Sequence, residues 1–306
     1  MAAPDDPQGL PDTERAAAGS VDLDLLAAPA LLDRLCGAYD AVGRAVRGTL
    51  PDLERALDAI RPRWLAGGRL LLAGAGTSGR VAALQAAECP PTFGLSPDRV
   101  LALVAGGSAA LAVAVEGAED DGGAGRAAVA AVAPGPLDTL IAVSASGGAP
   151  FVRGSLAAAR SSGALGVAIT ANAGSPLALE AEIALVLRTG PEPVAGSTRM
   201  LAGSAQKMAL DMLTTALMVQ VGHVHGNRMV DFRPTNRKLR RRAVTTVCDL
   251  TGVDPQGAEA ALVASGWRVK EAVVMTATGC GADAARARLE AAGGHLRPAL
   301  AGEPPA

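Results

Sequence analysis

Apolar residues along this chain follow helical spacing at first and then change to short uninterrupted runs. They recur at helical spacing over residues 25–47, and a second helical stretch covers residues 51–68. After that point, short apolar runs alternate with glycine-rich turns and helical segments. The runs lie at residues 69–73, 100–104, 139–143, 165–170 and 183–187.

The short runs predict a covered parallel sheet. They are apolar on both faces, as strands with helices on each side should be. Five such strands separated by helices predict an α/β fold, a doubly wound parallel sheet with helices on both faces, over about residues 60–222. Residues 201–221 form its closing helix, and strand signals stop after Asn227. Short helices are predicted beyond it, at residues 236–250, 254–266, 269–278 and 282–292.

This pattern divides the chain into three parts. An N-terminal arm and helix occupy residues 1–48, an α/β domain residues 49–228, and a helical region residues 229–306. The first 20 or so residues are polar, so we expect a loose arm. The N-terminus has no apolar signal-peptide core, and no apolar run reaches the roughly 18 residues of a membrane span. We therefore expect a cytoplasmic chain without a membrane partner.

Composition excludes several function classes. Lysine and arginine number 28 against 30 aspartates and glutamates, a net charge of −2, whereas nucleic-acid binders usually show a basic excess. Aromatic residues make up only 2%, which leaves few rings to stack on bases. The four cysteines lie far apart and there are three histidines, so no zinc-ligand spacing occurs. We expect neither a nucleic-acid partner nor a bound metal.

The loop after the first predicted strand has the pattern of an anion site. It reads GAGTSGR at residues 74–80 and leads into a helix, matching G-x-G-x-x-G. The acidic residue of a dinucleotide site is missing, since Asp98 precedes the second strand, and Arg80 stands where a Walker A loop has lysine. The hydroxyl groups of Thr77 and Ser78, with amides at a helix N-terminus, instead suit a phosphate monoester.

A second loop with the same character follows the third predicted strand. It contains Ser144, Ser146 and Gly147 and also leads into a helix. A serine-rich helix cap is one interpretation. The other is a shared ligand site, because the carboxyl ends of parallel strands meet at one edge of a sheet. Two such loops together favour a phosphorylated sugar over a dinucleotide.

Charged and polar residues near these loops are the remaining candidates. Glu88 is expected at the end of the helix that the first loop opens, where the helix dipole disfavours a carboxylate. Glu119 follows the second strand, and ordinary charge complementation at a helix start is its alternative interpretation. Ser197, Thr198 and Arg199 open the closing helix, and they either reach the same pocket or form a cap with a surface arginine.

A resemblance to a known family is carried by short segments over about residues 60–240. In order along the chain, these segments resemble the N-acetylmuramic acid 6-phosphate etherases of the sugar isomerase (SIS) superfamily. The resemblance implies an SIS-type sugar-phosphate-binding domain at residues 49–228 and a small ubiquitin-associated-type (UBA-like) helical region at residues 229–306. The segments are GAGTSGR (74–80), AAECPPTFG (86–94), VAGG (104–107), VEGAED (115–120), SASG (144–147), GSTRM (196–200), AQK (205–207), GNRMVD (226–231) and TNRKL (235–239).

The resemblance also implies a reaction, in cell-wall sugar recycling. The sugar opens to its aldehyde, a base removes the C2 proton, D-lactate leaves from C3, and water adds to give N-acetylglucosamine 6-phosphate. By motif, Glu88 would be the acid that protonates the lactate oxygen and Glu119 the base at C2. A carboxyl opposed by the helix dipole keeps its proton more readily, as an acid requires. Substrate contacts would fall on Thr77, Ser78, Ser144, Ser146, Gly147, Ser197, Thr198 and Arg199.

The family chemistry implies no metal and no redox cofactor, and SIS sites completed by a neighbouring subunit imply a homodimer. Two other functions remain open. One is a non-catalytic sugar-phosphate sensor like the animal glucokinase regulatory protein, which has two SIS modules. The other is an aldose–ketose isomerase, which would not require the segments around Glu88 and Glu119. A single module with both glutamates favours the etherase.

Overall fold

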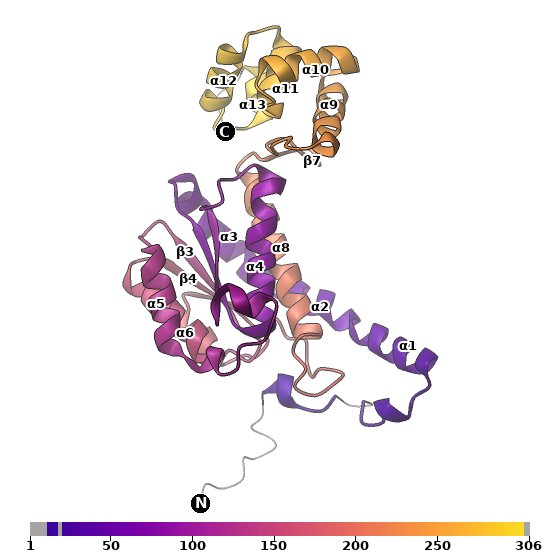
Figure 1. Cartoon of the computed structure of the whole chain (residues 1–306), viewed down its shortest axis with the longest axis vertical. Helices are drawn as coiled ribbons and strands as arrows, with labels where there is room; N and C mark the ends of the chain where they lie inside the picture. Colours follow the sequence, from indigo (N-terminus) through magenta and orange to yellow (C-terminus); the bar gives the residue numbers. More distant parts are fainter. Residues whose placement is uncertain (1–10, 18–19, 303–306) are drawn as a thin grey trace, which may run out of the picture. The chain divides into compact units, whose positions relative to one another are not determined.

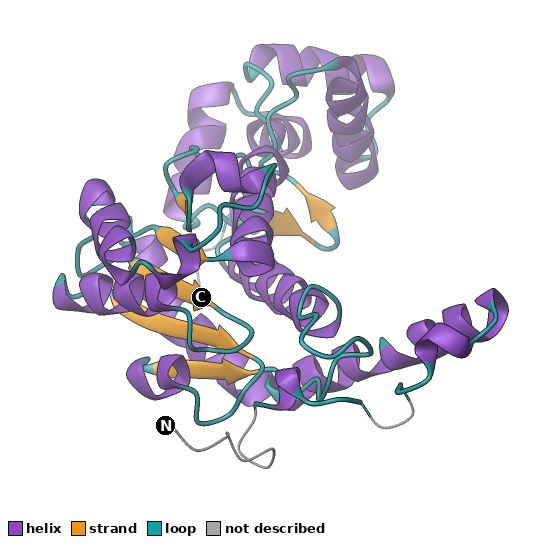
Figure 2. Ribbon diagram, turned by 60° about the horizontal axis from the view of Figure 1, so that its bottom comes forward, coloured by secondary structure: helices purple, strands orange, loops and turns teal. Residues whose placement is uncertain are grey.

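A five-stranded parallel sheet in the order β2-β1-β3-β4-β5 is the centre of this computed structural model, which describes residues 11–17 and 20–302. Figure 2 shows its strands side by side with helices on both sides. The prediction of a doubly wound parallel sheet is confirmed, and each strand lies within a residue of its predicted place. The strands are β1 Leu70–Gly74, β2 Val100–Val104, β3 Thr139–Val143, β4 Leu165–Thr170 and β5 Ile183–Val186.

Helices cover both faces of the sheet. They are α3 Leu50–Leu65, α4 Gly76–Phe93, α5 Gly122–Val132, α6 Pro150–Ser161, α7 Pro176–Glu180 and α8 Leu201–Gln220. Alternate strand residues point to opposite faces. Leu71 and Leu140 pack with Leu156 of α6 on one face, and α5 and α7 extend this cluster. Leu72 and Ile141 are fully buried on the other face, where Figure 1 shows α3 and α8.

The chain forms two compact units whose boundary crosses α4 and α8. Met1–Ala86 and Asp98–Leu213 make up the first, which holds the sheet, and Ala87–Pro97 and Thr214–Ala306 the second. The second unit is mainly helical, and its core is built around Phe232. Its elements are the antiparallel hairpin β6 Val224–His225 and β7 Arg228–Met229, and the helices α9 Arg237–Thr251, α10 Pro255–Ala264, α11 Val269–Thr278, α12 Ala282–Ala291 and α13 Leu296–Ala301.

The N-terminal region differs from its prediction in two respects. The helix expected at 25–47 is two helices, α1 Ala28–Ala38 and α2 Asp40–Gly48. Residues 1–10 and 18–19 of the predicted loose arm lie outside the described residues, but the one-turn helix η1, Asp12–Glu14, is anchored, because the side chain of Thr13 is completely buried. No helix in the described part of the chain combines the length and apolar character needed to cross a membrane.

Candidate active site

The strand order brings the two hydroxyl-rich loops to neighbouring positions. β1 pairs with β2 on one side and with β3 on the other, so the winding of the sheet reverses between β1 and β3. Open α/β sheets bind ligands at such a switch point, beyond the carboxyl ends of the strands. The first loop, residues 74–80, follows β1, and the second loop, residues 144–150, follows β3. Both loops therefore border the crevice where a ligand is expected.

The first loop is fixed by contacts with α8. α4 begins at Gly76, directly after β1. Ser78 is buried, and its Oγ donates a hydrogen bond of 2.9 Å to Oε1 of Gln206 on α8. Thr77 is half-buried beside Gly203, where an added Cβ would lie 3.0 Å from Thr77 Cγ2. The closing helix therefore fixes both hydroxyl-bearing residues of this loop.

Gln206 is a site residue that the sequence pattern does not predict. Its side chain is only 1% exposed, and its Nε2 finds no hydrogen-bond partner among the described residues. Buried polar groups are nearly always paired, and an unpaired N–H costs about 1–3 kcal/mol. An amide donor left open beside Ser78 suits an oxygen of a bound ligand. A glutamine between the fully buried Ala205 and Ala209 is the signal that points to it.

The second loop is a tight turn held by its own hydroxyl groups. Ser144 Oγ accepts from the amide of Gly147 at 3.1 Å, and Ser146 Oγ accepts from the amide of Gly148 at 3.2 Å. Gly147 has φ of +72°, and a Cβ there would lie 2.2 Å from Ser175 Oγ, so only glycine fits. Both serine O–H groups can donate to a ligand, Ser146 from an exposed position and Ser144 from a buried one.

α8 begins at Leu201, as predicted for the closing helix, but the expected cap from Ser197, Thr198 and Arg199 is wrong. The helix start lies two residues after Arg199, and its first amides are capped by Glu192, which accepts from Leu201 N at 2.8 Å and Ala202 N at 2.9 Å. Burial raises the pKa of Glu192, and the two amide hydrogen bonds offset only part of that effect. The amides of α8 are therefore taken by a carboxylate. The amides of Ser197 and Thr198 donate to the carbonyls of Val194 and Gly196, so these two residues could donate to a ligand only through their hydroxyl groups.

Ser197, Thr198 and Arg199 lie in different surroundings. Thr198 is half-buried, and its carbonyl oxygen accepts from the amide of Gly203 at 2.9 Å, which keeps it near Thr77. Ser197 is half-buried as well, whereas the side chain of Arg199 is exposed. Thr198 is thus held near the first loop.

Thr13, in the N-terminal segment, contacts a residue at the carboxyl ends of the strands. Asn172, which follows β4, donates from Nδ2 to Thr13 Oγ1 at 3.1 Å and to the carbonyl of Ala145 at 3.0 Å. The carbonyl of Thr13 accepts from the amide of Gly196 at 3.1 Å. Asn172 Oδ1 is buried and has no partner within residues 11–17 and 20–302. A second open polar atom therefore lies beside the second loop.

Glu119 lies on the one-turn helix η4, Ala118–Asp120, which contacts α6. α5 follows directly, and its start touches the backbone of α6, because a Cβ on Gly154 would lie 2.3 Å from the carbonyl oxygen of Gly122. Since the second loop runs into α6, this contact holds Glu119 near that loop. Its carboxylate is exposed in the single chain.

Glu88 lies within α4, and the prediction that the helix ends there is wrong. α4 continues through Pro90-Pro91 to Phe93. Prolines remove helical hydrogen bonds, but burial of Cys89 and Phe93 on either side of the pair favours continuation. The helix end therefore does not oppose the charge of Glu88, and its side chain is exposed.

Comparison with known proteins identifies the family. The profile of the SIS domain matches residues 129–216, and that of the glucokinase regulatory protein N-terminal SIS domain matches residues 52–160. An N-acetylmuramic acid 6-phosphate etherase of Deinococcus radiodurans is 48% identical over 94% of this chain and 94% of its own length. The chain belongs to the N-acetylmuramic acid 6-phosphate etherase family.

Further relatives agree with this assignment. An N-acetylmuramic acid 6-phosphate etherase of Salmonella typhimurium is 46% identical, over 92% of this chain and 95% of that protein. Among solved structures, a phosphoheptose isomerase from Francisella tularensis has a TM-score of 0.47 and 17% identity over 64% of this chain and 99% of its own. A similarity this distant says nothing about chemistry. In this member of the etherase family, the two hydroxyl-rich loops follow neighbouring strands of the first unit, and Thr198 and Gln206 lie beside the first of them.

Proposed function

We propose that this chain converts N-acetylmuramic acid 6-phosphate and water to N-acetylglucosamine 6-phosphate and D-lactate. The observation that carries the proposal is the pair of hydroxyl-rich loops at the switch point between β1 and β3, with the open amide of Gln206 beside them. This arrangement suits a phosphorylated sugar, and the relatives at 46–48% identity are named for such a substrate.

The phosphate group is assigned to the first and second loops. The first amides of α4, at Gly76, Thr77 and Ser78, have no partner within a helix of this geometry and carry the positive end of its dipole. The hydroxyl groups of Thr77, Ser144 and Ser146 add donors around the same crevice, Gly147 shapes the second loop, and Ser197, Thr198 and Arg199 offer side chains from the α8 side.

The elimination is assigned to the two glutamates. Glu119 takes the C2 proton of the open-chain aldehyde, and the C–H electrons pass to the carbonyl oxygen to give an enolate. The enolate electrons then form the C2–C3 double bond and restore the aldehyde as the C3–O bond breaks. Glu88 gives a proton to the departing lactate oxygen. Water then adds its hydroxyl to C3 and a proton to C2. Each acid or base role is worth about 10²–10⁴ in rate.

The test measures D-lactate and C2 exchange together. In D₂O, the wild-type protein should release lactate and give a product deuterated at C2. Glu119→Gln should stop both events, whereas Glu88→Gln should stop lactate release and still exchange the C2 proton. Glu116→Gln, an exposed carboxylate three residues before Glu119, is the matched control and should stay active. Lactate release by Glu119→Gln would contradict the mechanism.

The same assay separates the two alternatives. A sugar-phosphate sensor binds N-acetylmuramic acid 6-phosphate and releases no lactate. An isomerase converts an aldose phosphate to a ketose phosphate without needing Glu88. Either outcome with the wild-type protein would overturn the etherase assignment.

We also propose that the protein works as a homodimer. None of the residues of α1 is buried in the single chain, and Leu32 on this helix is 66% exposed, which supports an apolar contact with a second copy. Light scattering should give the mass of a dimer, and Leu32→Asp should give a monomer with reduced lactate release. Val263→Asp, at a valine of α10 that is 61% exposed, is the control. A monomeric wild-type protein would contradict the proposal.

A further inference from the structure

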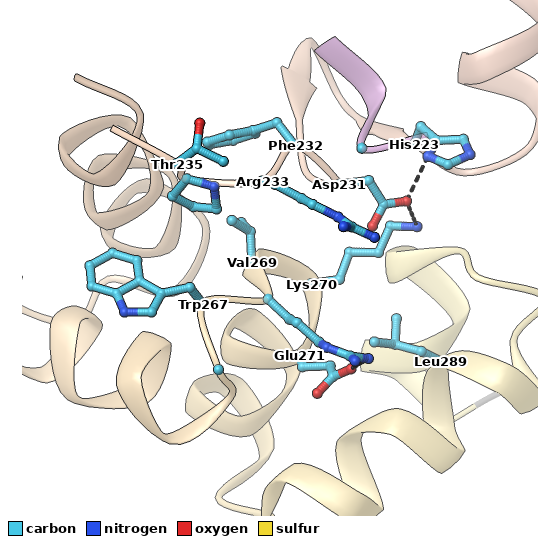
Figure 3. A pocket seen from close by; sticks show the side chains of 14 residues that line it. His223, Asp231, Phe232, Arg233, Thr235, Trp267, Val269, Lys270, Glu271 and Leu289 are labelled. Atoms are coloured by element: carbon cyan, nitrogen blue, oxygen red, sulfur yellow. Dashed lines mark hydrogen bonds and ion pairs between the residues drawn. The ribbon is translucent and has the colours of Figure 1, made fainter. Parts of the chain in front are cut away.

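A pocket of about 640 Å³ lies within the second unit. Its walls come from the segment after β7, the loop between α10 and α11, and the start of α11, as Figure 3 shows. The volume is within the range of small-molecule sites, about 300–1,000 Å³. None of its lining residues belongs to the loops of the candidate active site.

One wall of the pocket is a partly buried ionic cluster centred on Asp231. Its Oδ2 forms an ion pair with Lys270 Nζ at 2.5 Å and lies 2.8 Å from His223 Nδ1, although that nitrogen is not aligned for a hydrogen bond. Lys270 also donates to the carbonyl of Gly294 at 2.8 Å. Burial by itself would raise the pKa of Asp231, but the close contact with His223 and the charge of Lys270 lower it below its usual value. The carboxylate is therefore ionised at neutral pH and able to accept from ligand hydroxyl groups.

The charges that line the pocket do not cancel. Lys270 is paired with Asp231, and Glu271 is paired with Arg268 at 2.9 Å and with Arg286 at 3.4 Å. Arg233 has no ion-pair partner in the part of the chain that the structure describes. Figure 3 shows its side chain extending toward the centre of the pocket. Because the guanidinium of Arg233 is not engaged in an ion pair, it can bind one anionic group of a ligand.

Trp267 supplies a flat apolar wall. Its backbone lies in the left-handed region, with φ of +62°, a conformation that costs a bulky residue about 1–2 kcal/mol. The adjacent Gly266 has φ of +64°, and the amide of Trp267 is held by the carbonyl of Leu262 at 2.6 Å. The guanidinium of Arg240 lies 4.8 Å from the ring centroid. The loop thus holds a half-buried indole ring in a fixed position in the wall of the pocket.

We propose that this pocket binds a monosaccharide that carries a carboxylate or a phosphate. Arg233 pairs with the anionic group, Asp231 and Lys270 bind hydroxyl groups, and the indole ring of Trp267 packs against the apolar C–H face of the sugar. An apolar acid lacks the hydroxyl groups that Asp231 accepts from, and a neutral sugar leaves Arg233 unpaired. The inference does not depend on the proposed function, because it concerns binding by residues outside the candidate active site.

Fluorescence can test the proposal because the chain has two tryptophans, Trp64 and Trp267. In a Trp64→Phe background, emission reports on Trp267 alone. The protein is titrated with three sugars. N-acetylglucosamine 6-phosphate tests for a phosphate ligand, N-acetylmuramic acid tests for a carboxylate ligand, and N-acetylglucosamine is the neutral control. We expect a saturable change with at least one anionic sugar and binding of the neutral sugar about tenfold weaker or more.

A pair of arginine variants assigns the signal to the pocket. Arg233→Gln should weaken binding of the anionic sugar about 10- to 100-fold, the value of a charge-assisted hydrogen bond. Arg288→Gln, at an exposed arginine of α12 outside the pocket, should bind like the parent. The proposal is overturned if no sugar gives a saturable change up to about 10 mM, or if Arg233→Gln binds like the parent.

Discussion

Replacing Gln206 with methionine tests whether its buried amide exists for the ligand. In the free protein, the amide makes one hydrogen bond with Ser78, of 2.9 Å, and leaves Nε2 unpaired. Such a bond contributes about 1 kcal/mol, whereas an unpaired buried donor costs about 1–3 kcal/mol. Methionine has similar length and removes the unpaired donor, but it also leaves the buried O–H of Ser78 without its acceptor. The two effects oppose each other, so Gln206→Met should change the free energy of unfolding by less than about 2 kcal/mol.

The same substitution should impair the reaction. If Nε2 donates to a phosphate or sugar oxygen, its loss removes a hydrogen bond to a charged or strongly polar group, worth about 1.5–3 kcal/mol. That corresponds to a loss of about 10- to 150-fold in kcat/KM. Urea unfolding gives the first quantity and D-lactate release the second. Gln220→Met, at an exposed position on the same helix, should change neither.

Two results would refute this reasoning. A loss of stability greater than about 2 kcal/mol would mean that the amide has a structural role. An unchanged kcat/KM would mean that Nε2 does not face the ligand. The double variant Ser78→Ala with Gln206→Met separates the contributions, because removing both partners leaves no unpaired group and should be no less stable than either single variant.

Three further predictions concern stability, each measured by denaturant unfolding. Gly147→Ala should destabilise the protein by at least about 2 kcal/mol, from the left-handed backbone and the displaced Ser175, whereas Gly148→Ala, whose Cβ would meet nothing closer than 3.7 Å, should be nearly neutral. The pKa of Glu192 is raised in the folded state, so the wild-type protein should lose stability relative to Glu192→Gln as the pH rises above the ordinary glutamate range. A wild-type protein that gains stability relative to this variant over the same range would contradict the prediction. The lowered pKa of Asp231 contributes stability above the ordinary aspartate range that is lost on acidification, and Asp231→Asn should remove this acid sensitivity.

The sheet was predictable because its signal is local. Each strand is a short run that is apolar on both faces, and glycines mark the ends of several helices in the second unit. The extension of α4 beyond Glu88 was not predictable in the same way, since two prolines argue against a helix and only the burial of Cys89 and Phe93 outweighs them. The β6–β7 hairpin, with two residues in each strand, is too short to show any period.

The residues of the candidate site likewise fall into those with a local sequence signal and those defined by long-range contacts. The two hydroxyl-rich loops were predictable because strand ends share an edge in every parallel sheet. Gln206 and Asn172 were not, since their significance lies in contacts with Ser78 and Thr13, residues 128 and 159 positions away in sequence. The cap that Glu192 places on α8 likewise depends on a loop whose path no local pattern specifies.

The exposure of the two glutamates links the proposed chemistry to the proposed dimer. A carboxylic acid keeps its proton near neutral pH where water is excluded, and general acid catalysis of lactate departure needs such a proton. In the single chain, Glu88 and Glu119 are both exposed, although the loops proposed to hold the phosphate are already formed. In the proposed mechanism, one chain therefore supplies the loops for the phosphate but leaves both glutamates open to water. A covering surface from a second copy, together with the substrate itself, would exclude this water, so assembly and catalysis would depend on one another.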